Sequence, residues 1–271
     1  MSCKFFLYKG MGRKAESGHP WIYTTEIEGY DGTYENGDII AFLGRYGFGS
    51  SVEICGMVAP AYRNQGIFSR LLKKALSPDQ LHRYNTVLLN TPNNSLTGLA
   101  FMESIPARLS STEHQMKFNP NLGGVDEQSR STPAIELRAA TQEDLESIIS
   151  LDMDGFNQSL EDASEMAQRM MEESGSTTYM VLQNERAVGK LRVTQENEEA
   201  WVYGFVIQSG LRGQGVGRAA LMKVIELVQA DGKDVFIEVA ADNDRALHLY
   251  TSCGFETFQA QQYYTYQKIA D

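Results

Sequence analysis

Residues 201–217 read WVYGFVIQSGLRGQGVG, and this stretch decides the fold of the second half of the chain. Its first part, 201–207, is aromatic and β-branched, which is typical of a central β-strand. A glycine-rich segment follows at 212–217, and apolar residues then recur at helical spacing as far as residue 230. Glycines let backbone amides converge on an anion, and a helix N-terminus adds partial positive charge. The segment therefore favours a phosphate or pyrophosphate, although a lone glycine-rich turn would indicate only a tight connection.

The glycine-rich segment has an earlier counterpart. Residues 63–68 read RNQGIF and residues 212–217 read RGQGVG, so the two lie 149 positions apart. The same spacing relates Asn94 to Asn243 and Phe101 to Tyr250. Three landmarks at one spacing indicate a duplicated unit rather than a chance turn.

The second copy continues with a longer pattern, and this pattern carries a family resemblance. After the loop come the strand centred on Glu238 and the helical pattern that holds Asn243, Ala246, Leu249, Tyr250 and the glycine Gly254. The arrangement R-x-x-G-x-G followed by N-x-x-A-x-x-L-Y-x-x-x-G-F resembles the GNAT acetyltransferase superfamily. The resemblance covers 135–271 and, more loosely, 37–118. Its duplication is similar to that of tandem members in which one copy is degenerate.

The resemblance implies the fold class. We expect an α/β (α+β) protein of two tandem GNAT domains, each a mixed, mostly antiparallel twisted sheet flanked by helices. A V-shaped splay between the central strands is part of this expectation. Residues 1–120 would form a degenerate N-terminal domain, 121–134 a polar linker rich in Gly, Pro, Ser and Asn, and 135–271 the catalytic domain.

Periodicity and turn residues predict the individual elements. Strands are expected at 52–58, 86–90, 112–118, 135–138, 177–183, 187–194, 201–207 and 234–240. Helices are expected at 67–76, 95–103, from 145 to about 153, 161–173, 216–230 and 243–252. Residues 255–268 are interpreted as a hairpin.

The resemblance also implies how acetyl-CoA would be held. Backbone groups of Phe205, Val206 and Ile207 would bind the pantetheine arm, and Asn243 would touch it or the acyl region. The pyrophosphate would lie on the loop and the first turn of the helix, formed by Arg212, Gly213, Gln214, Gly215, Val216, Gly217 and Arg218.

Two residues are the candidates for proton transfer. Tyr250 stands where the family carries the donor to the leaving thiolate. Glu238 stands where one branch, the N-terminal-alanine acetyltransferases of ribosomal proteins, carries a catalytic glutamate, since an ammonium must lose a proton before attack. It could instead be a polar residue of a sheet face. Glu198 and Glu199 are alternative bases, or solvated turn charges.

The first copy lacks both groups. At the spacing of 149, Leu89 takes the place of Glu238 and Phe101 that of Tyr250, while Phe68 replaces Gly217. Phenylalanine fills the same space without a hydroxyl, so the sequence predicts a structural role for this copy and an active site in the C-terminal domain.

The first forty residues carry a second, weaker resemblance. The segments 18–23, 26–27 and 37–40 resemble the opening of the PUA-type RNA-binding module. A net charge of −11 and a sequence pI near 4.9 argue against a nucleic-acid partner. We therefore give little weight to an RNA role.

The composition argues against a metal site and a membrane-spanning helix. Cysteines and histidines are not clustered at metal-ligand spacing, and no stretch approaches the ~20 apolar residues of a membrane helix. We thus expect no metal, no membrane partner and a cytoplasmic location. The sequence predicts an acetyl-CoA-dependent N-acetyltransferase acting on a small-molecule or peptide amine, and it leaves the oligomeric state open. The alternative is a non-catalytic acyl-CoA-binding or sensor protein.

Overall fold

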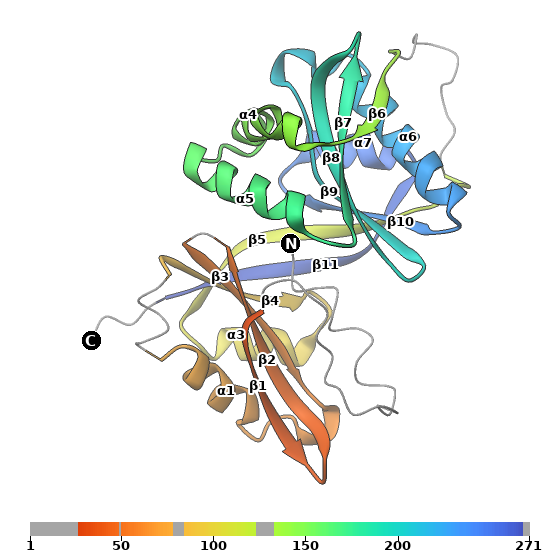
Figure 1. Cartoon of the computed structure of the whole chain (residues 1–271). Helices are drawn as coiled ribbons and strands as arrows, with labels where there is room; N and C mark the ends of the chain where they lie inside the picture. Colours follow the sequence, from red (N-terminus) through yellow and green to blue (C-terminus); the bar gives the residue numbers. More distant parts are fainter. Residues whose placement is uncertain (1–26, 49, 78–83, 123–132, 268–271) are drawn as a thin grey trace. The chain divides into compact units, whose positions relative to one another are not determined.

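The structure is a computed structural model that describes residues 27–48, 50–77, 84–122 and 133–267 (Figure 1). It divides into two compact units. Unit 1 comprises 1–111 and 261–271, and unit 2 comprises 112–260. Both boundaries fall inside long strands, because β5 (Ala107–Phe118) and β11 (Phe255–Tyr266) each contribute one half to either unit.

Unit 2 is built on a mostly antiparallel sheet in the order β11-β5-β10-β9-β8-β7-β6. The strands confined to it are β6 (Glu136–Ala139), β7 (Ser176–Gln183), β8 (Arg186–Glu196), β9 (Glu199–Ile207) and β10 (Asp234–Ala240). Its helices are α4 (Leu145–Phe156), α5 (Leu160–Glu172), α6 (Val216–Ala230) and α7 (Asp244–Ser252). The strands β9 and β10 pair in parallel, and α6 makes the crossover between them.

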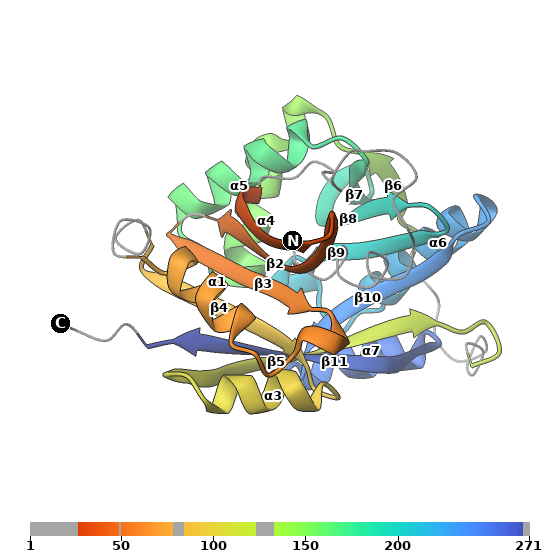
Figure 2. The same ribbon diagram turned by 90° about the horizontal axis from the view of Figure 1, so that it is seen from below.

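Helices cover both faces of this sheet (Figures 1 and 2). The apolar stripe of α6 and Tyr250 of α7 share one core with strand residues such as Val202 and Ile237. A smaller core on the other face joins α4 and α5 to Met180 and Val206. This layered mixed fold agrees with the fold class expected from the sequence.

The parallel pair β9–β10 opens toward its C-terminal ends. The ladder begins at Asp234↔Glu199 and ends at Ile237↔Val202, although β9 continues to Ile207 and β10 to Ala240. On the other side of β9, the ladder with β8 shifts register between Lys190↔Val206 and Arg192↔Tyr203. Gly204 lies at this bulge with φ +53°, a left-handed conformation that glycine adopts readily. Beyond Val202 and Ile237 the parallel ladder therefore no longer joins β9 to β10.

The bulge changes which face Phe205 presents. In a regular strand Trp201, Tyr203 and Phe205 would share a face, as alternation predicts. The extra residue Gly204 reverses the alternation, so Phe205 packs against the α6–α7 core and stacks beside Tyr250, while Trp201 and Tyr203 stack on the opposite face. The prediction of one shared face was wrong for Phe205.

Unit 1 has a smaller sheet of related design, in the order β1-β2-β3-β4-β11-β5. Its own elements are β1 (Ile27–Glu35), β2 (Asp38–Phe48), β3 (Ser51–Val58), α1 (Ile67–Ala75), β4 (Thr86–Pro92) and α3 (Leu96–Glu103). The parallel pair β3–β4 forms a ladder from Ser51↔Thr86 to Ile54↔Leu89 and then opens as well. The ladder between β2 and β3 is regular, so this unit has no bulge at the corresponding place.

The structural correspondence between the units differs from the sequence spacing in one respect. The ladder Ser51↔Thr86 to Ile54↔Leu89 maps onto Glu199↔Asp234 to Val202↔Ile237 at a spacing of 148, not 149. Gly204 is an extra residue of unit 2 at the bulge. In the glycine-rich loop that follows it, corresponding residues of the two units are separated by 149 positions.

A spacing of 148 also relates the two final helices. Ser95 caps α3 and Asn243 caps α7. Asn243 therefore corresponds to Ser95 rather than to Asn94. The counterpart of Tyr250 is Met102, the one buried residue of α3, and the counterpart of Glu238 is Asn90. These structural counterparts differ from Phe101 and Leu89, which the sequence spacing pairs with Tyr250 and Glu238, and neither counterpart is a tyrosine or a carboxylate.

Most expected elements are present to within a few residues, and α6 and β10 match their expected bounds. The hairpin expected at 255–268 is wrong, because β11 is one strand of 12 residues. Its C-terminal half pairs with β4, whose residues lie far away in sequence. Residues 123–132 of the expected linker and most of the PUA-like segment lie outside the described residues, and the domain limits stay a prediction.

The start of α4 supports a testable prediction about stability. Thr141 N–H donates to Asp144 Oδ2 at 2.8 Å, and Arg138 donates to both carboxylate oxygens at 2.8 and 3.0 Å. Hydrogen bonding to Arg138 lowers the pKa of Asp144 to about 2. We expect Asp144→Ala to lower the free energy of unfolding by about 1–2 kcal/mol, measured by urea denaturation at pH 7.

This stabilisation should depend on pH with a defined sign. A carboxyl group whose pKa is lower in the folded state stabilises that state above its unfolded pKa, which is about 3.9 for Asp. The difference between wild type and Asp144→Ala should therefore shrink as pH falls from about 5 toward 2. A difference that stays constant over this range would show that the ionised carboxylate is not the stabilising group.

Candidate functional site

The glycine-rich loop of unit 2 leads from the open end of β9 into α6. Gly213 and Gly215 have φ of +80° and +86°, and Gly215 is the N-cap of α6. No side chain caps this helix, and its first turn carries no acidic residue. The first backbone N–H groups of α6 thus have no partner within the helix and are available to an anion, as the sequence predicted.

Side chains of the loop hold its backbone rather than extend from it. Arg212 Nε donates to Ile207 O at 2.7 Å, and Gln214 Nε2 donates to Gly210 O at 2.9 Å. Arg218 Nη2 donates to Ser252 O at 2.9 Å, which ties α6 to the end of α7. These three residues therefore shape the loop, and its backbone amides remain the anion-binding groups.

The same hydrogen bonds recur in unit 1 at the spacing of 149. Arg63 Nε donates to Val58 O at 3.0 Å, and Gln65 Nε2 donates to Ala61 O at 3.3 Å. Asn64 has φ +60° where unit 2 has Gly213, and Gly66 caps α1 with φ +69°. The loop conformation is thus common to both units.

The two loops differ in what fills the opening of the parallel strands. In unit 1 the ring of Phe68 lies against Gly56, where an added Cβ would be 2.7 Å from Phe68 Cε2. The same ring packs edge-on against Phe101 at 5.1 Å between centroids. Gly217 stands in the place of Phe68 in unit 2, and a Cβ there would meet its nearest neighbour at 3.4 Å. An aromatic side chain therefore packs at the opening of unit 1, and no side chain does so from this position of unit 2.

Tyr250 lies beside the open half of β9. Its ring is buried and stacks with Phe205 at 6.5 Å and lies 6.2 Å from Phe255. Burial raises the pKa of Tyr250 well above its ordinary value. The phenol is consequently neutral at physiological pH and can donate a proton or a hydrogen bond. The structure thus brings Tyr250 together with a residue expected to bind the pantetheine arm.

Glu238 lies on the other face of the sheet. It alternates with Ile237 and Val239, which belong to the α6–α7 core, so its side chain points toward the face that carries Phe236. Gln115 of β5 lies opposite in the ladder and donates Nε2 to Glu238 Oε1 at 2.9 Å. The negative charge of Glu238 is close enough to Tyr203 to help raise the pKa of that phenol, after burial.

The alternative bases lie at the far end of β9. Glu199 begins the strand at the closed end of the ladder, where Trp201 Nε1 donates to its Oε2 at 3.2 Å. Glu198 O accepts the backbone N–H of Asp234 at 2.8 Å in the adjacent turn. Of these three candidate bases, Glu238 is therefore the one next to the opening.

Asn243 has a local structural role. Its side-chain oxygen accepts the backbone N–H of Ala246 at 3.1 Å and caps α7. This cap fixes the start of α7, whose seventh residue is Tyr250. Asn243 is exposed, so its position leaves it accessible to a bound molecule.

Several residues that shape the site were missed by sequence reasoning. Gly204 had a signal, because a glycine inside a strand pattern often marks a bulge. Lys190 had a weaker one, a lysine within the apolar pattern of β8, and it forms a buried ion pair with Asp152 at 2.7 Å. Gln115 had none, because it comes from a strand 123 positions away from Glu238.

Other kinds of site are not indicated within the described residues. No group of three or more His, Cys, Asp or Glu there could hold a metal ion. No helix in the described part of the chain is both long and apolar enough to cross a membrane.

Comparison with known protein families agrees with this geometry. Residues 143–255 match the acetyltransferase (GNAT) family. The matched residues lie within unit 2. This match supports the prediction that the chain is an N-acetyltransferase, whose substrate would be an amine acceptor. Residues 5–48 match a PUA-like domain, which confirms the second resemblance.

One curated relative and two solved structures are similar over most of the chain. The mycothiol acetyltransferase of Brachybacterium faecium is 28% identical over 220 residues, and the match covers 74% of this chain and 64% of the relative. A GCN5-related N-acetyltransferase from Sphaerobacter thermophilus has a TM-score of 0.66 at 18% identity, over 85% of this chain and 77% of that one. A tandem GNAT protein from the clavulanic acid biosynthesis pathway has a TM-score of 0.67 at 15% identity, over 88% and 82%.

Proposed function

We propose that the chain is an acetyl-CoA-dependent N-acetyltransferase with its active site in unit 2. The observation that carries the proposal is the open end of β9–β10, which is adjacent to an uncapped helix N-terminus and to Tyr250. The GNAT match covers this region.

The residues present fit a CoA group. Beyond Val202 the β9 edge that faces β10 is no longer engaged in the parallel ladder, so the backbone at Phe205, Val206 and Ile207 can pair with an extended amide-bearing arm. The amides around Gly213 and Gly215 and the first turn of α6 suit a pyrophosphate. Gly217 adds no side chain that would obstruct this surface.

Acetyl-CoA would supply the acetyl thioester, and two residues of the chain would accept and donate the protons that are transferred. Glu238 would take up the proton that the acceptor ammonium must lose. Tyr250 Oη would provide a proton or a hydrogen bond to the departing sulfur. The two side chains come from opposite faces of the sheet, which is compatible with one reaction centre if the thioester lies in the opening between β9 and β10.

We further propose that the two units are tandem GNAT copies and that unit 1 is inactive. The support is the matching four-pair ladders, the shared loop hydrogen bonds and the fold similarity to a tandem GNAT protein. Met102 and Asn90 stand in place of Tyr250 and Glu238, and Phe68 occupies the space next to Gly56.

A direct assay tests the function. The full chain is incubated with acetyl-CoA and a panel of amines that includes peptides, polyamines, amino sugars and cysteine-containing conjugates, and release of free CoA thiol is followed. We expect release that requires one class of amine. Hydrolysis alone, or no release with any amine, would contradict an acetyltransferase function.

Substitution of Gly215 should weaken CoA binding. A β-branched residue at φ +86° is strained, and a Cβ would lie 3.2 Å from Pro133 Cδ. We expect Gly215→Val to raise the dissociation constant for CoA at least tenfold, about 1.4 kcal/mol, in a calorimetric titration.

The matched control is Gly66→Val, which places the same strain at the N-cap of α1. It should leave CoA affinity within about twofold, because we assign the cofactor to unit 2. The opposite result, with Gly66→Val weakening binding and Gly215→Val not, would move the cofactor site to unit 1.

A specific feature favours the alternative of a non-catalytic acyl-CoA-binding protein. Glu238 Oε1 accepts a hydrogen bond from Gln115, and Tyr250 is buried, so both proposed proton-transfer groups are engaged in packing. Tight CoA binding without transfer to any amine of the panel would support this alternative.

A further inference from the structure

The last turn of α4 contacts the chain segment 204–209 directly at Val206 and Ser209, and through Lys190 at Gly204. We call Asp152, Asp154 and Gly155 the α4 clamp. The segment contains the bulge, the open part of β9 and the start of the glycine-rich loop. Each contact is of a different physical kind, and the three are distributed from one end of the segment to the other.

The first contact is a buried ion pair at the bulge. Lys190 Nζ lies 2.7 Å from Asp152 Oδ1, and the two side chains are only 2% and 4% exposed. The same Nζ would be 3.5 Å from a Cβ at Gly204. The ammonium group therefore lies against the residue that turns the strand, and Asp152 holds it there.

The second contact is a close approach of helix and strand. A Cβ added to Gly155 would lie 2.2 Å from Val206 Cγ2, which is far inside van der Waals contact. Only glycine allows α4 to approach β9 this closely, so the position of Val206 is fixed by direct packing.

The third contact is at the loop. Asp154 Oδ2 accepts the backbone N–H of Ser209 at 2.8 Å and a hydrogen bond from Arg212 Nη2 at 3.0 Å. Hydrogen bonds from Ser209 lower the pKa of Asp154, so the carboxylate is ionised at neutral pH. Because Arg212 Nε also donates to Ile207 O, Asp154 restrains both ends of the turn between β9 and the loop.

We propose that the α4 clamp holds segment 204–209 in the conformation that binds acetyl-CoA, and that Asp152, Asp154 and Gly155 are positioning residues for cofactor binding. This inference rests on the proposed function. It separates the residues that bind the cofactor, which are on β9 and in the loop, from those that preorganise them. Loosening the clamp should raise KM for acetyl-CoA and change kcat less, because the clamp touches neither Glu238 nor Tyr250.

The decisive variants are Gly155→Ala and Asp154→Asn. Gly155→Ala must displace Val206, and we expect the dissociation constant for CoA to rise at least tenfold. Asp154→Asn keeps the size of the side chain and removes the charge from two hydrogen bonds at a partly exposed position, so about a fivefold rise is expected. Asp154→Asn also covers the case in which Gly155→Ala fails to fold.

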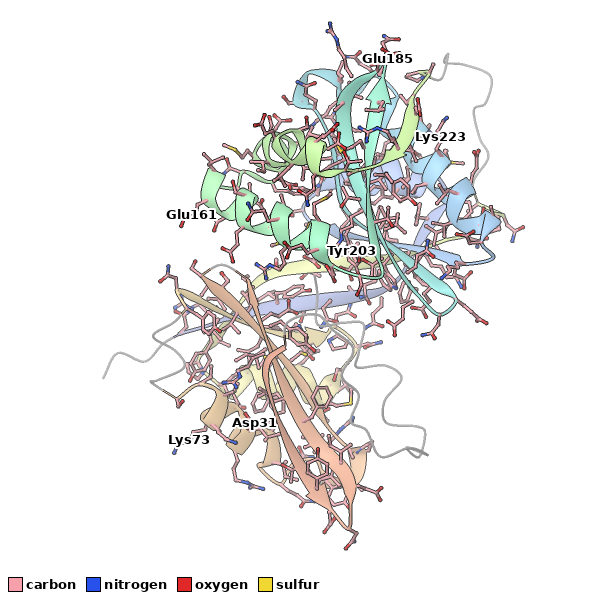
Figure 3. The ribbon with its side chains drawn as sticks, viewed as in Figure 1. Asp31, Lys73, Glu161, Glu185, Tyr203 and Lys223 are labelled. Carbon is pink, nitrogen blue, oxygen red and sulfur yellow. The ribbon has the colours of Figure 1, made fainter. Side chains whose placement is uncertain are left out.

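Two controls bracket these variants. Met153→Ala shortens an exposed side chain of the same helix turn. Glu161→Gln removes a carboxylate that projects from α5 into solvent (Figure 3). Neither contacts segment 204–209, and both should keep CoA affinity within about twofold.

The readouts are calorimetric titration with CoA and hydrogen exchange of the backbone amides of 204–209 in the chain without ligand. Faster exchange in this segment together with weaker CoA binding would support the proposal. Unchanged affinity in both Gly155→Ala and Asp154→Asn, with a wild type that binds CoA, overturns the clamp but not the proposed function. A wild-type chain that binds no CoA overturns both.

Discussion

Tyr250→Phe should lower kcat for acetyl transfer by about 10²-fold, the size expected when a group that assists proton transfer is removed. The substitution deletes only the phenol oxygen. The ring can keep its contacts with Phe205 and Phe255, so the fold and CoA affinity should be unchanged. The measurement is steady-state release of CoA thiol with the accepted amine, accompanied by a CoA titration of the same variant.

The control for this variant is Tyr179→Phe. Tyr179 is a partly buried tyrosine that packs against the α6–α7 core. Burial raises its pKa as well, but it belongs to β7, which is separated from β9 and β10 in sheet order. It should retain full activity. Equal activity of Tyr250→Phe and wild type would show that the Tyr250 hydroxyl takes no part in the reaction.

The raised pKa of Tyr250 predicts one feature of the pH profile. Because burial raises it, the phenol stays protonated throughout the range from pH 6 to about 10, where an ordinary tyrosine would begin to ionise. Ionisation of Tyr250 should therefore cause no decline of kcat near pH 10. The wild type and Tyr250→Phe should have kcat profiles of the same shape in this range. A decline present only in the wild type would indicate a phenol with an ordinary pKa.

The C-terminal half was predictable because its signals are local. The apolar periodicity of α6 and the β-branched run of β10 determine their own limits, and the glycines define the loop between them. The paths of β5 and β11 were not predictable in this way. Each is a long strand whose partners come from distant parts of the chain, so no pattern within 255–268 distinguishes one continuous strand from a hairpin.

In the candidate site, too, local features could be predicted and contacts between distant segments could not. The sequence pattern singled out Tyr250 and the loop glycines, and the structure has Tyr250 stacked beside Phe205 and Gly215 at the start of α6. A single inserted residue, Gly204, shifted Phe205 to the face of Tyr250 and changed the correspondence between the copies. Gln115 and the α4 clamp could not be predicted, because they meet the site through tertiary packing between elements far apart in sequence.

Glu238→Gln should lower kcat/KM at pH 7 by about 10²-fold with a strongly basic amine, if Glu238 is the general base. The variant should fold normally. Gln115 can rotate its amide so that its oxygen accepts from the new amide nitrogen, which preserves a hydrogen bond between β5 and β10. The measurement is the pH dependence of kcat/KM for a series of amines of different pKa.

The loss should depend on the amine. A lysine-like amine with a pKa near 10.4 is almost fully protonated at pH 7, so removal of the base leaves only the small neutral fraction to react. The variant rate should then rise about tenfold per pH unit until the amine pKa is reached. A weakly basic amine is already neutral and should lose little.

Glu199→Gln serves as the matched control at the closed end of the same parallel ladder and should behave as wild type. If Glu238→Gln instead reduced the rates of all amines equally at every pH, Glu238 would act by holding β10 against Gln115 and not by accepting a proton. A loss confined to Glu199→Gln would make that residue the base and require the acceptor to reach the other end of β9.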